Sequence, residues 1–151
     1  MKHLSILLIA LFTFNNLSAQ KYTTKYITDA NKVGLQWWND VNSGQYSKAY
    51  QTLSSELQNR WSVDIWSKYI SYEMEEFGEV ISRTVNDTYF TNELDSTIEN
   101  GFYVVIAYDV IYANTRNHSE ELIVKQSDDF MWEIFNFNWS FQNQEPLVEK
   151  E

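Results

Sequence analysis

The stretch VDIWSKYISYEMEEFGEVISRTVNDTYF, residues 63–90, contains the change of pattern that decides the fold. Before Gly78, apolar residues recur every three or four positions, which is the spacing of one face of an α-helix. After Gly78, Val, Ile, Thr and Tyr become frequent, as in β-strands. Ser62 is a suitable N-cap and Gly78 a suitable end residue, so the pattern predicts a helix over residues 63–77 and a strand over residues 79–90.

The residues before this stretch are expected to be helical as well. Apolar spacing predicts an amphipathic helix from about Thr28 to Asn42, which Ser43 and Gly44 end. A short second helix is predicted over residues 46–53, and a further helical turn over residues 54–61. Helices therefore occupy the first half of the domain.

The residues after Phe90 predict three more strands, over residues 102–113, 120–126 and 131–141. Their connections are short and rich in turn residues, so an antiparallel meander is the simplest order. Helices followed by strands define an α+β fold, in which N-terminal helices pack on a twisted four-stranded antiparallel sheet. One domain is expected over residues 26–141, followed by a flexible acidic tail over residues 142–151.

The last strand predicts an aromatic wall. If its side chains alternate strictly, Phe135, Phe137 and Trp139 point to one side, and that side is expected to face the helices. Ile134 and Asn136 would then point away from them. The sequence leaves open whether the space between wall and helices is filled by side chains or forms a pocket.

The first 19 residues have the pattern of a secretory signal peptide. Lys2 precedes an apolar run over residues 4–14, and small residues place cleavage between Ala19 and Gln20. The run is shorter than the roughly 20 apolar residues that span a bilayer, so no membrane span is expected. No Cys is present for lipid attachment. The mature protein is expected in the periplasm or outside the cell, with residues 20–25 as an N-terminal extension.

The composition excludes several classes of function. Eleven Lys and Arg stand against 21 Asp and Glu, a net charge of −10, which is unsuited to binding nucleic acid. With no Cys and two His, the chain lacks thiol nucleophiles, disulfides and multi-histidine metal sites. No metal and no cofactor are expected. His118, the one histidine after residue 19, is expected in a polar loop and is assigned no role.

The order of short motifs resembles a bacterial family catalogued as domain of unknown function 4019. The residues that carry the resemblance are spread over the chain: Trp37, Gly44, Tyr46, Ala49, Tyr50, Trp61, the stretch 78–83, Tyr103 to Val105, Glu121 and Trp132. The family pattern often has Pro-Asp-Gly where this chain has Glu99-Asn100-Gly101. The resemblance implies an exported single-domain protein with a nuclear-transport-factor-2-like or cystatin-like roll, and no established activity.

Asp109 is the candidate for catalysis, because it interrupts an apolar strand. A carboxylate among apolar and aromatic side chains has a raised pKa and acts as a general base, with Tyr103 or Tyr108 as an oxyanion donor. The alternative is that Asp109 faces solvent on the outer side of the sheet or pairs across strands.

Four residues are candidates for ligand binding. Arg83 and Glu121 are placed to bind a carboxylate or sugar group at the mouth of the fold, or else to form an ion pair or solubilise a sheet edge. Trp38 is expected to be a half-exposed contact residue, since it is rotated by about 100° from Trp37. Tyr103 completes the set. Aromatic residues at these spacings are also typical of a core.

The sequence therefore favours an exported, non-catalytic domain that binds a small molecule or an envelope protein at its concave aromatic face. A homodimer formed through the outer sheet face is a further candidate. The alternative is a small isomerase or hydratase-like enzyme that uses Asp109 as general base. A third hypothesis is an interaction module with a filled core.

Overall fold

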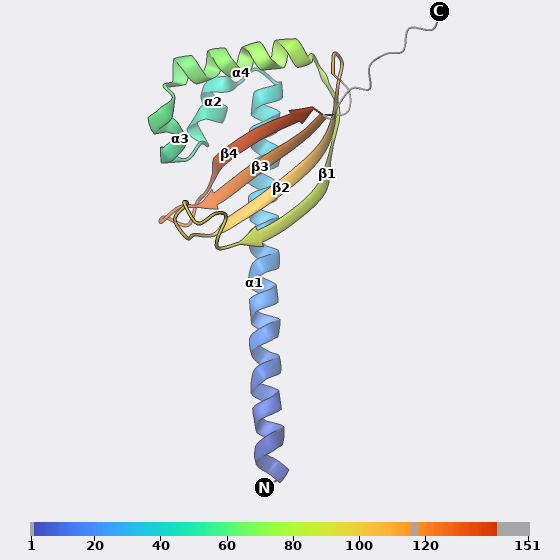
Figure 1. The fold of residues 1–151 in the computed structure, drawn as a ribbon, viewed down its shortest axis with the longest axis vertical. Helices are drawn as coiled ribbons and strands as arrows, with labels where there is room; N and C mark the ends of the chain where they lie inside the picture. Colours follow the sequence, from blue (N-terminus) through green and yellow to red (C-terminus); the bar gives the residue numbers. More distant parts are fainter. Residues whose placement is uncertain (1, 116–117, 142–151) are drawn as a thin grey trace, which may run out of the picture.

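The computed structural model describes the backbone of residues 2–115 and 118–141 and the side chains of residues 21–115 and 118–140. Four helices precede four strands (Figure 1): α1 Lys2–Asn42, α2 Tyr46–Gln51, α3 Ser55–Arg60, α4 Val63–Phe77, β1 Val80–Thr91, β2 Tyr103–Tyr112, β3 His118–Gln126 and β4 Trp132–Phe141. The strands form one antiparallel sheet in the order β1-β2-β3-β4. The predicted α+β fold and its meander are confirmed. The tail predicted over residues 142–151 lies outside the described residues.

The first helix is longer than the sequence analysis predicts. It begins at Lys2 instead of near Thr28, and the expected extension over residues 20–25 is part of it. No Pro or Gly interrupts residues 2–33, so nothing in that stretch ends a helix. Lys25 and Asp29 form an ion pair one turn apart, which supports the helix across the expected start.

The helix α4 has the predicted bounds because both of its ends are fixed. The Ser62 hydroxyl accepts a hydrogen bond from the Ile65 N–H, as an N-cap does. Gly78 has φ 78° and ψ −166°, a conformation that residues with a Cβ avoid, and its N–H donates to the Met74 carbonyl. The chain therefore turns from helix to strand at Gly78.

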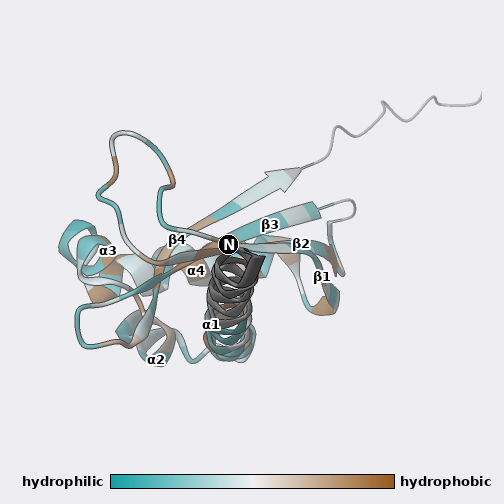
Figure 2. Cartoon of the chain, turned by 90° about the horizontal axis from the view of Figure 1, so that it is seen from below, coloured by the Kyte–Doolittle hydropathy of each residue, from teal (hydrophilic) through white to brown (hydrophobic). Residues whose placement is uncertain are grey.

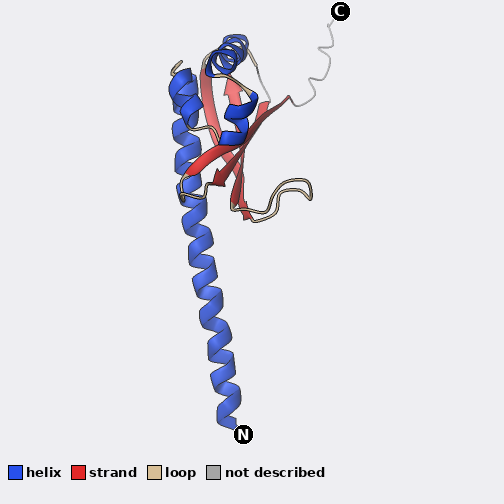
Figure 3. Cartoon of the chain, turned by 90° about the vertical axis from the view of Figure 1, so that its left-hand side faces the viewer, coloured by secondary structure: helices blue, strands red, loops and turns tan. Residues whose placement is uncertain are grey.

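The helix α1 runs along one side of the sheet (Figure 3). In Figure 2, a view nearly along α1, the strands cross above it. The open edge of the sheet is β1, because among the described residues no segment pairs with its outer side. The other edge, β4, is covered at Ile134, whose N–H and carbonyl bond to the Thr52 carbonyl and the Ser54 N–H.

The predicted aromatic wall of β4 is wrong at two positions, Ile134 and Phe135. A bulge makes Val124 pair with Ile134 and Ile123 with Asn136, so Phe135 is an extra residue. Ile134, Phe137 and Trp139 therefore pack on the helix side. Phe135 instead packs edge to face against Tyr103, with ring centroids 5.4 Å apart. Tyr103 precedes Val104, a core residue, so it lies on the opposite face of the sheet.

The concave face is filled at its centre. Trp37, Trp38 and Trp66 are fully buried between α1, α4 and the sheet. Where β1 ends and β2 begins, Tyr26 of α1 packs on Phe90 and Phe102, with ring centroids 5.5 and 5.4 Å from its own. A ligand site on this face of the sheet therefore lies at its margins, where the helices leave the sheet edges.

Candidate functional site

A buried ion pair lies where α1 crosses β1, β2 and β3. Arg83 Nε donates to Glu120 Oε2 at 2.7 Å, and Arg83 Nη2 donates to Glu120 Oε1 at 3.2 Å. The Tyr112 hydroxyl donates to Glu120 Oε1 at 2.6 Å and accepts from Arg83 Nη2 at 2.8 Å. The two charged side chains are 9% and 0% exposed. This two-pronged geometry is the strong form of an arginine–carboxylate contact.

Aromatic rings enclose the pair. Arg83 Cζ lies 4.1 Å from the centroid of Trp38, a cation–π distance. Trp38 is 1% exposed, so it is part of the core and the expected half-exposed position is wrong. The reason is that α1 lies flat on the sheet, and a residue beside Trp37 also reaches the strands. Burial raises the pKa of Tyr112, and the neighbouring Glu120 carboxylate raises it further.

A bulge in β1 brings Arg83 to this position. Val80 pairs with Tyr112 and Arg83 with Val110, so Ile81 is the extra residue of the strand. Without the bulge, Val80 and Arg83 would lie on opposite faces of the sheet. With it, both lie on the helix side, because Tyr112 and Val110 belong to the core there.

The partner of Arg83 is Glu120 and not the neighbouring Glu121. Glu120 is buried and in phase with Leu122 and Val124, which belong to the core, whereas Glu121 is exposed opposite Asn138 on the outer face. The sequence analysis missed Glu120, although this alternation was a signal that could have found it.

His118 was predicted to lie in a polar loop, and this prediction is wrong. It is the first residue of β3 and is buried, with its ring 4.8 Å from that of Phe77 and 5.5 Å from that of Tyr112. Burial lowers its pKa below the ordinary value. The polar sequence around His118 concealed its position, because a strand needs only alternate residues to be apolar.

Beside the ion pair, α1 and β1 enclose a groove of about 430 Å³, within the range of small-ligand pockets. The α1 wall is one stripe of the helix, with Asn31, Leu35 and Asn39 spaced four residues apart. Ile81 and Val85 form the β1 wall. Arg83 and Tyr108 also line the groove, which joins an apolar lining to a few polar groups.

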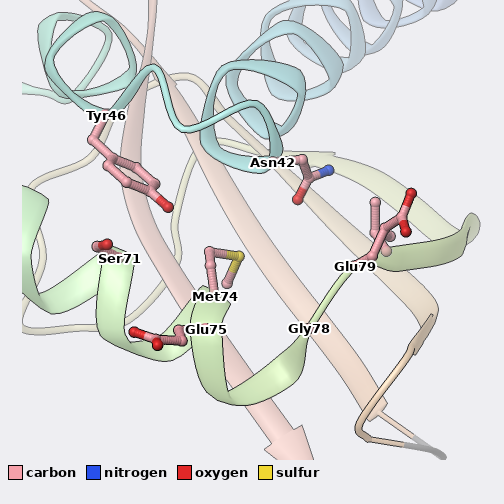
Figure 4. Close-up of a pocket in the computed structure, with 8 residues that line it drawn as sticks. Asn42, Tyr46, Ser71, Met74, Glu75, Gly78 and Glu79 are labelled. Atoms are coloured by element: carbon pink, nitrogen blue, oxygen red, sulfur yellow. The ribbon is translucent and has the colours of Figure 1, made fainter.

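A second, more polar hollow of about 600 Å³ adjoins this groove and shares Asn42 and Val80 with it. In Figure 4, Tyr46 of α2 and Met74 of α4 point toward one another across it. Glu79 also lines this hollow, and the hollow lacks the apolar walls of the groove. No group of His, Cys, Asp or Glu in the described part of the chain is arranged to hold a metal ion.

Asp109 is exposed on the outer face of the sheet, where Asn86 Nδ2 donates to its Oδ1 at 3.5 Å. Tyr108 precedes it and lies on the helix side, so the sheet separates the two side chains. Tyr103 shares the outer face but is six residues away along the strand, roughly 20 Å at about 3.3 Å per residue. Asp109 has neither the burial nor the neighbouring tyrosine on which the general-base hypothesis depends.

Tyr103 lies far from the groove. It is fully buried, and its hydroxyl donates to the Glu99 carbonyl at 2.8 Å, which fixes the β1–β2 connection over the outer face. Of the four candidate binding residues, the structure brings Arg83 and Trp38 together and places Glu121 and Tyr103 elsewhere.

The fold and the groove define a small α+β domain with a cleft at one sheet edge. Within this class, the chain belongs to the family described as protein of unknown function (DUF4019), whose sequence model matches residues 33–149. The predicted family is confirmed, and the match begins in the last quarter of α1. Neither a curated protein nor a solved structure matches the chain. None of the helices in the described part of the chain is long and apolar enough to cross a membrane.

Proposed function

We propose that this chain is an exported, non-catalytic binding domain. Its ligand would be a small neutral molecule, held in the groove between α1 and β1, with an apolar body and one hydrogen-bond-accepting head group. We also propose that its fold is a nuclear-transport-factor-2-like or cystatin-like roll. The packing of helices on one face of an antiparallel meander supports this assignment.

One observation carries the proposal: the Tyr108 side chain. It is 3% exposed and lines the groove, and its hydroxyl forms no hydrogen bond with the described residues. Burial raises its pKa to about 12, so the hydroxyl keeps its proton and is available as a donor. The hydroxyl oxygen itself is not fully buried, so it reaches the groove, where an acceptor of the ligand would bond to it in place of water.

The charges in and around the groove favour a neutral ligand. Arg83 lines it, but Glu120 neutralises the guanidinium charge. The chain as a whole carries −10, which disfavours an anionic head group. Leu35 and Ile81 are 58% and 67% exposed on its walls, and an apolar body would cover them.

Export is the second part of the proposal. It rests on the signal-peptide pattern of residues 1–19, with Ala19 and Gln20 at the cleavage site. The helix α1 begins its aromatic contacts with the sheet at Tyr26, beyond that site. Removal of residues 1–19 would leave these contacts in place.

Titration of the ¹⁵N-labelled chain with 2-octanone, and separately with octanoate, tests the ligand class by amide chemical shifts. We expect 2-octanone to perturb residues of the groove and to bind more tightly than octanoate. Tyr108→Phe should weaken 2-octanone binding about five-fold, since one neutral hydrogen bond contributes about 1 kcal/mol. Tyr72→Phe, at an exposed tyrosine of α4, is the matched control. Unchanged affinity in Tyr108→Phe, or shifts confined to other parts of the chain, would refute the proposal.

A further inference from the structure

A third cavity lies at the opposite edge of the sheet. It has a volume of about 230 Å³ and is enclosed by α3, the start of α4 and strand β4. Figure 1 shows α3 and α4 beside β4, whereas the groove described above lies between α1 and β1. The two sites share no lining residue, so this cavity is independent of the proposed function.

Aromatic rings form its walls. Trp61 and Tyr69 have ring centroids 4.9 Å apart, and Tyr69 lies 6.1 Å from Trp139 of β4. All three side chains are half-buried, so part of each ring is accessible from the cavity. Such rings offer apolar faces with negative charge density, which suit the C–H groups on one face of a saturated ring.

The corner between α3 and α4 is held rigidly. Trp61 ends α3 in an extended conformation, and its carbonyl accepts a hydrogen bond from the Tyr50 hydroxyl at 2.7 Å. The next residue, Ser62, caps α4. The Trp61 ring is therefore presented on a fixed backbone, which lowers the entropy lost when a ligand binds.

Polar groups surround the aromatic walls. Arg60, Asn136 and Asn138 line the cavity and are exposed, but the register of β4 places the two asparagine side chains on the outer face of the sheet, opposite Ile123 and Glu121. On the helix side, the Trp139 Nε1–H is buried without a partner among the described residues. The Arg60 guanidinium and this indole N–H can both donate. A purely apolar ligand would leave these groups without partners, whereas a ligand with several hydroxyls would satisfy them.

The surroundings are unfavourable to an anion. The Glu73 carboxylate lies close enough to Tyr69 to help burial raise the pKa of its hydroxyl. The net charge of the chain is −10. A neutral polyhydroxylated ring therefore fits the cavity better than a carboxylate does.

We propose that the cavity formed by Trp61, Tyr69 and Trp139, with Arg60 at its rim, binds one pyranose ring of a neutral glycan. The aromatic rings pack on the faces of the sugar, and Arg60 bonds to its hydroxyls. This is the arrangement by which a small site combines apolar contact with a few oriented polar groups.

Intrinsic tryptophan emission reports on this site, because three of the six Trp residues, Trp61, Trp66 and Trp139, line it. The probes are cellobiose, lactose, maltose and diacetylchitobiose, each titrated into the full chain. We expect a saturable change with at least one of them, at a dissociation constant of about 1–10 mM. No saturable change with any of the four overturns the proposal.

One variant locates the binding. Arg60→Gln should weaken it several-fold, and this residue has no described side-chain contact that folding needs. Lys68→Gln and Asn59→Ala remove exposed groups that do not line the cavity, and they should leave binding unchanged. Equal binding by all three variants would place the sugar elsewhere and overturn the proposal. Glycan binding does not depend on Tyr108, so it can fail or succeed separately from the groove.

Discussion

The guanidinium of Arg83 lies between the Trp38 ring, 4.1 Å away, and the carboxylate of Glu120, 2.7 Å from its Nε. Residues from α1, β1 and β3 thus meet in one buried contact. Burying two charges costs solvation, which an excellent geometry and further hydrogen bonds offset. Tyr112 supplies such hydrogen bonds to both partners. The stability of this contact therefore depends on the pair and not on either charge alone.

Arg83→Met should lower the free energy of unfolding by about 3–5 kcal/mol, because it leaves Glu120 charged and unpaired in the core. Glu120→Met should do the same to Arg83. The double variant should recover much of this loss, since apolar side chains of similar volume replace the pair. Urea denaturation of the four proteins forms a double-mutant cycle. Losses that simply add in the double variant would show that the two charges are not coupled.

Gly34 sets the distance between α1 and the sheet. A Cβ at this position would lie 2.9 Å from Leu122 Cδ2 and 3.2 Å from the Tyr108 hydroxyl oxygen. Gly34→Val should therefore push α1 from the sheet and lower the free energy of unfolding by about 1–3 kcal/mol, the usual cost of overpacking. Lys32→Val, at an exposed position of the same helix, measures the helix propensity of Val alone. Equal urea midpoints for the two variants would contradict the close packing at Gly34.

Most of the fold follows from local patterns. The helix over residues 63–77 has a Ser N-cap, periodic apolar residues and a terminal Gly, and each of these signals acts over a few residues. Local patterns did not predict where α1 starts. The amphipathic spacing begins near Thr28, but the helix continues back to Lys2 because no Pro or Gly interrupts it. Periodicity locates the packed part of a helix, and it does not mark the end of an unpacked part.

The site was harder to predict, because it depends on strand register. Bulges at Ile81 and Phe135 each add one residue, and each reverses which side chains face the helices. Simple alternation therefore assigned Phe135 to the wrong face of the sheet. The pairing of Arg83 with Glu120 joins residues 37 positions apart and needs the sheet order as well. Within β3 itself, only the alternation of Glu120 with the apolar residues Leu122 and Val124 could have indicated that Glu120 is buried.

Glu56 should contribute to stability in a pH-dependent way. Burial alone would raise its pKa, but hydrogen bonds from Lys125, from its own backbone N–H and from Ser54 together lower it to about 2. Lys125 Nζ donates to Glu56 Oε1 at 2.5 Å. A folded pKa below the unfolded value stabilises the fold above the unfolded value, near 4.5, and this contribution is lost as pH falls toward about 2.

Glu56→Gln should therefore reduce the urea midpoint at pH 6, and its difference from the parent protein should shrink as the pH is lowered through 4 toward 3. Glu75→Gln, at an exposed residue of α4, is the control and should show no such convergence. A difference that stays constant over this range would mean that the Lys125 contact does not lower the pKa of Glu56.

Tyr26 should anchor the end of α1 that remains after removal of residues 1–19. Its ring packs on Phe90, Phe102 and Trp132, with centroids 5.5, 5.4 and 5.9 Å away. In a chain that begins at Gln20, Tyr26→Ala should lower the free energy of unfolding by about 2 kcal/mol, since the side chain is half-buried and a fully buried ring costs about 3–5 kcal/mol. Tyr22→Ala removes a ring that is 60% exposed and is the matched control. Urea denaturation of both variants, beside the unsubstituted chain from Gln20, measures the difference. Equal stability of the two variants would show that α1 packs on the sheet without its Tyr26 contacts, so that the folded domain begins further along the chain than residue 26.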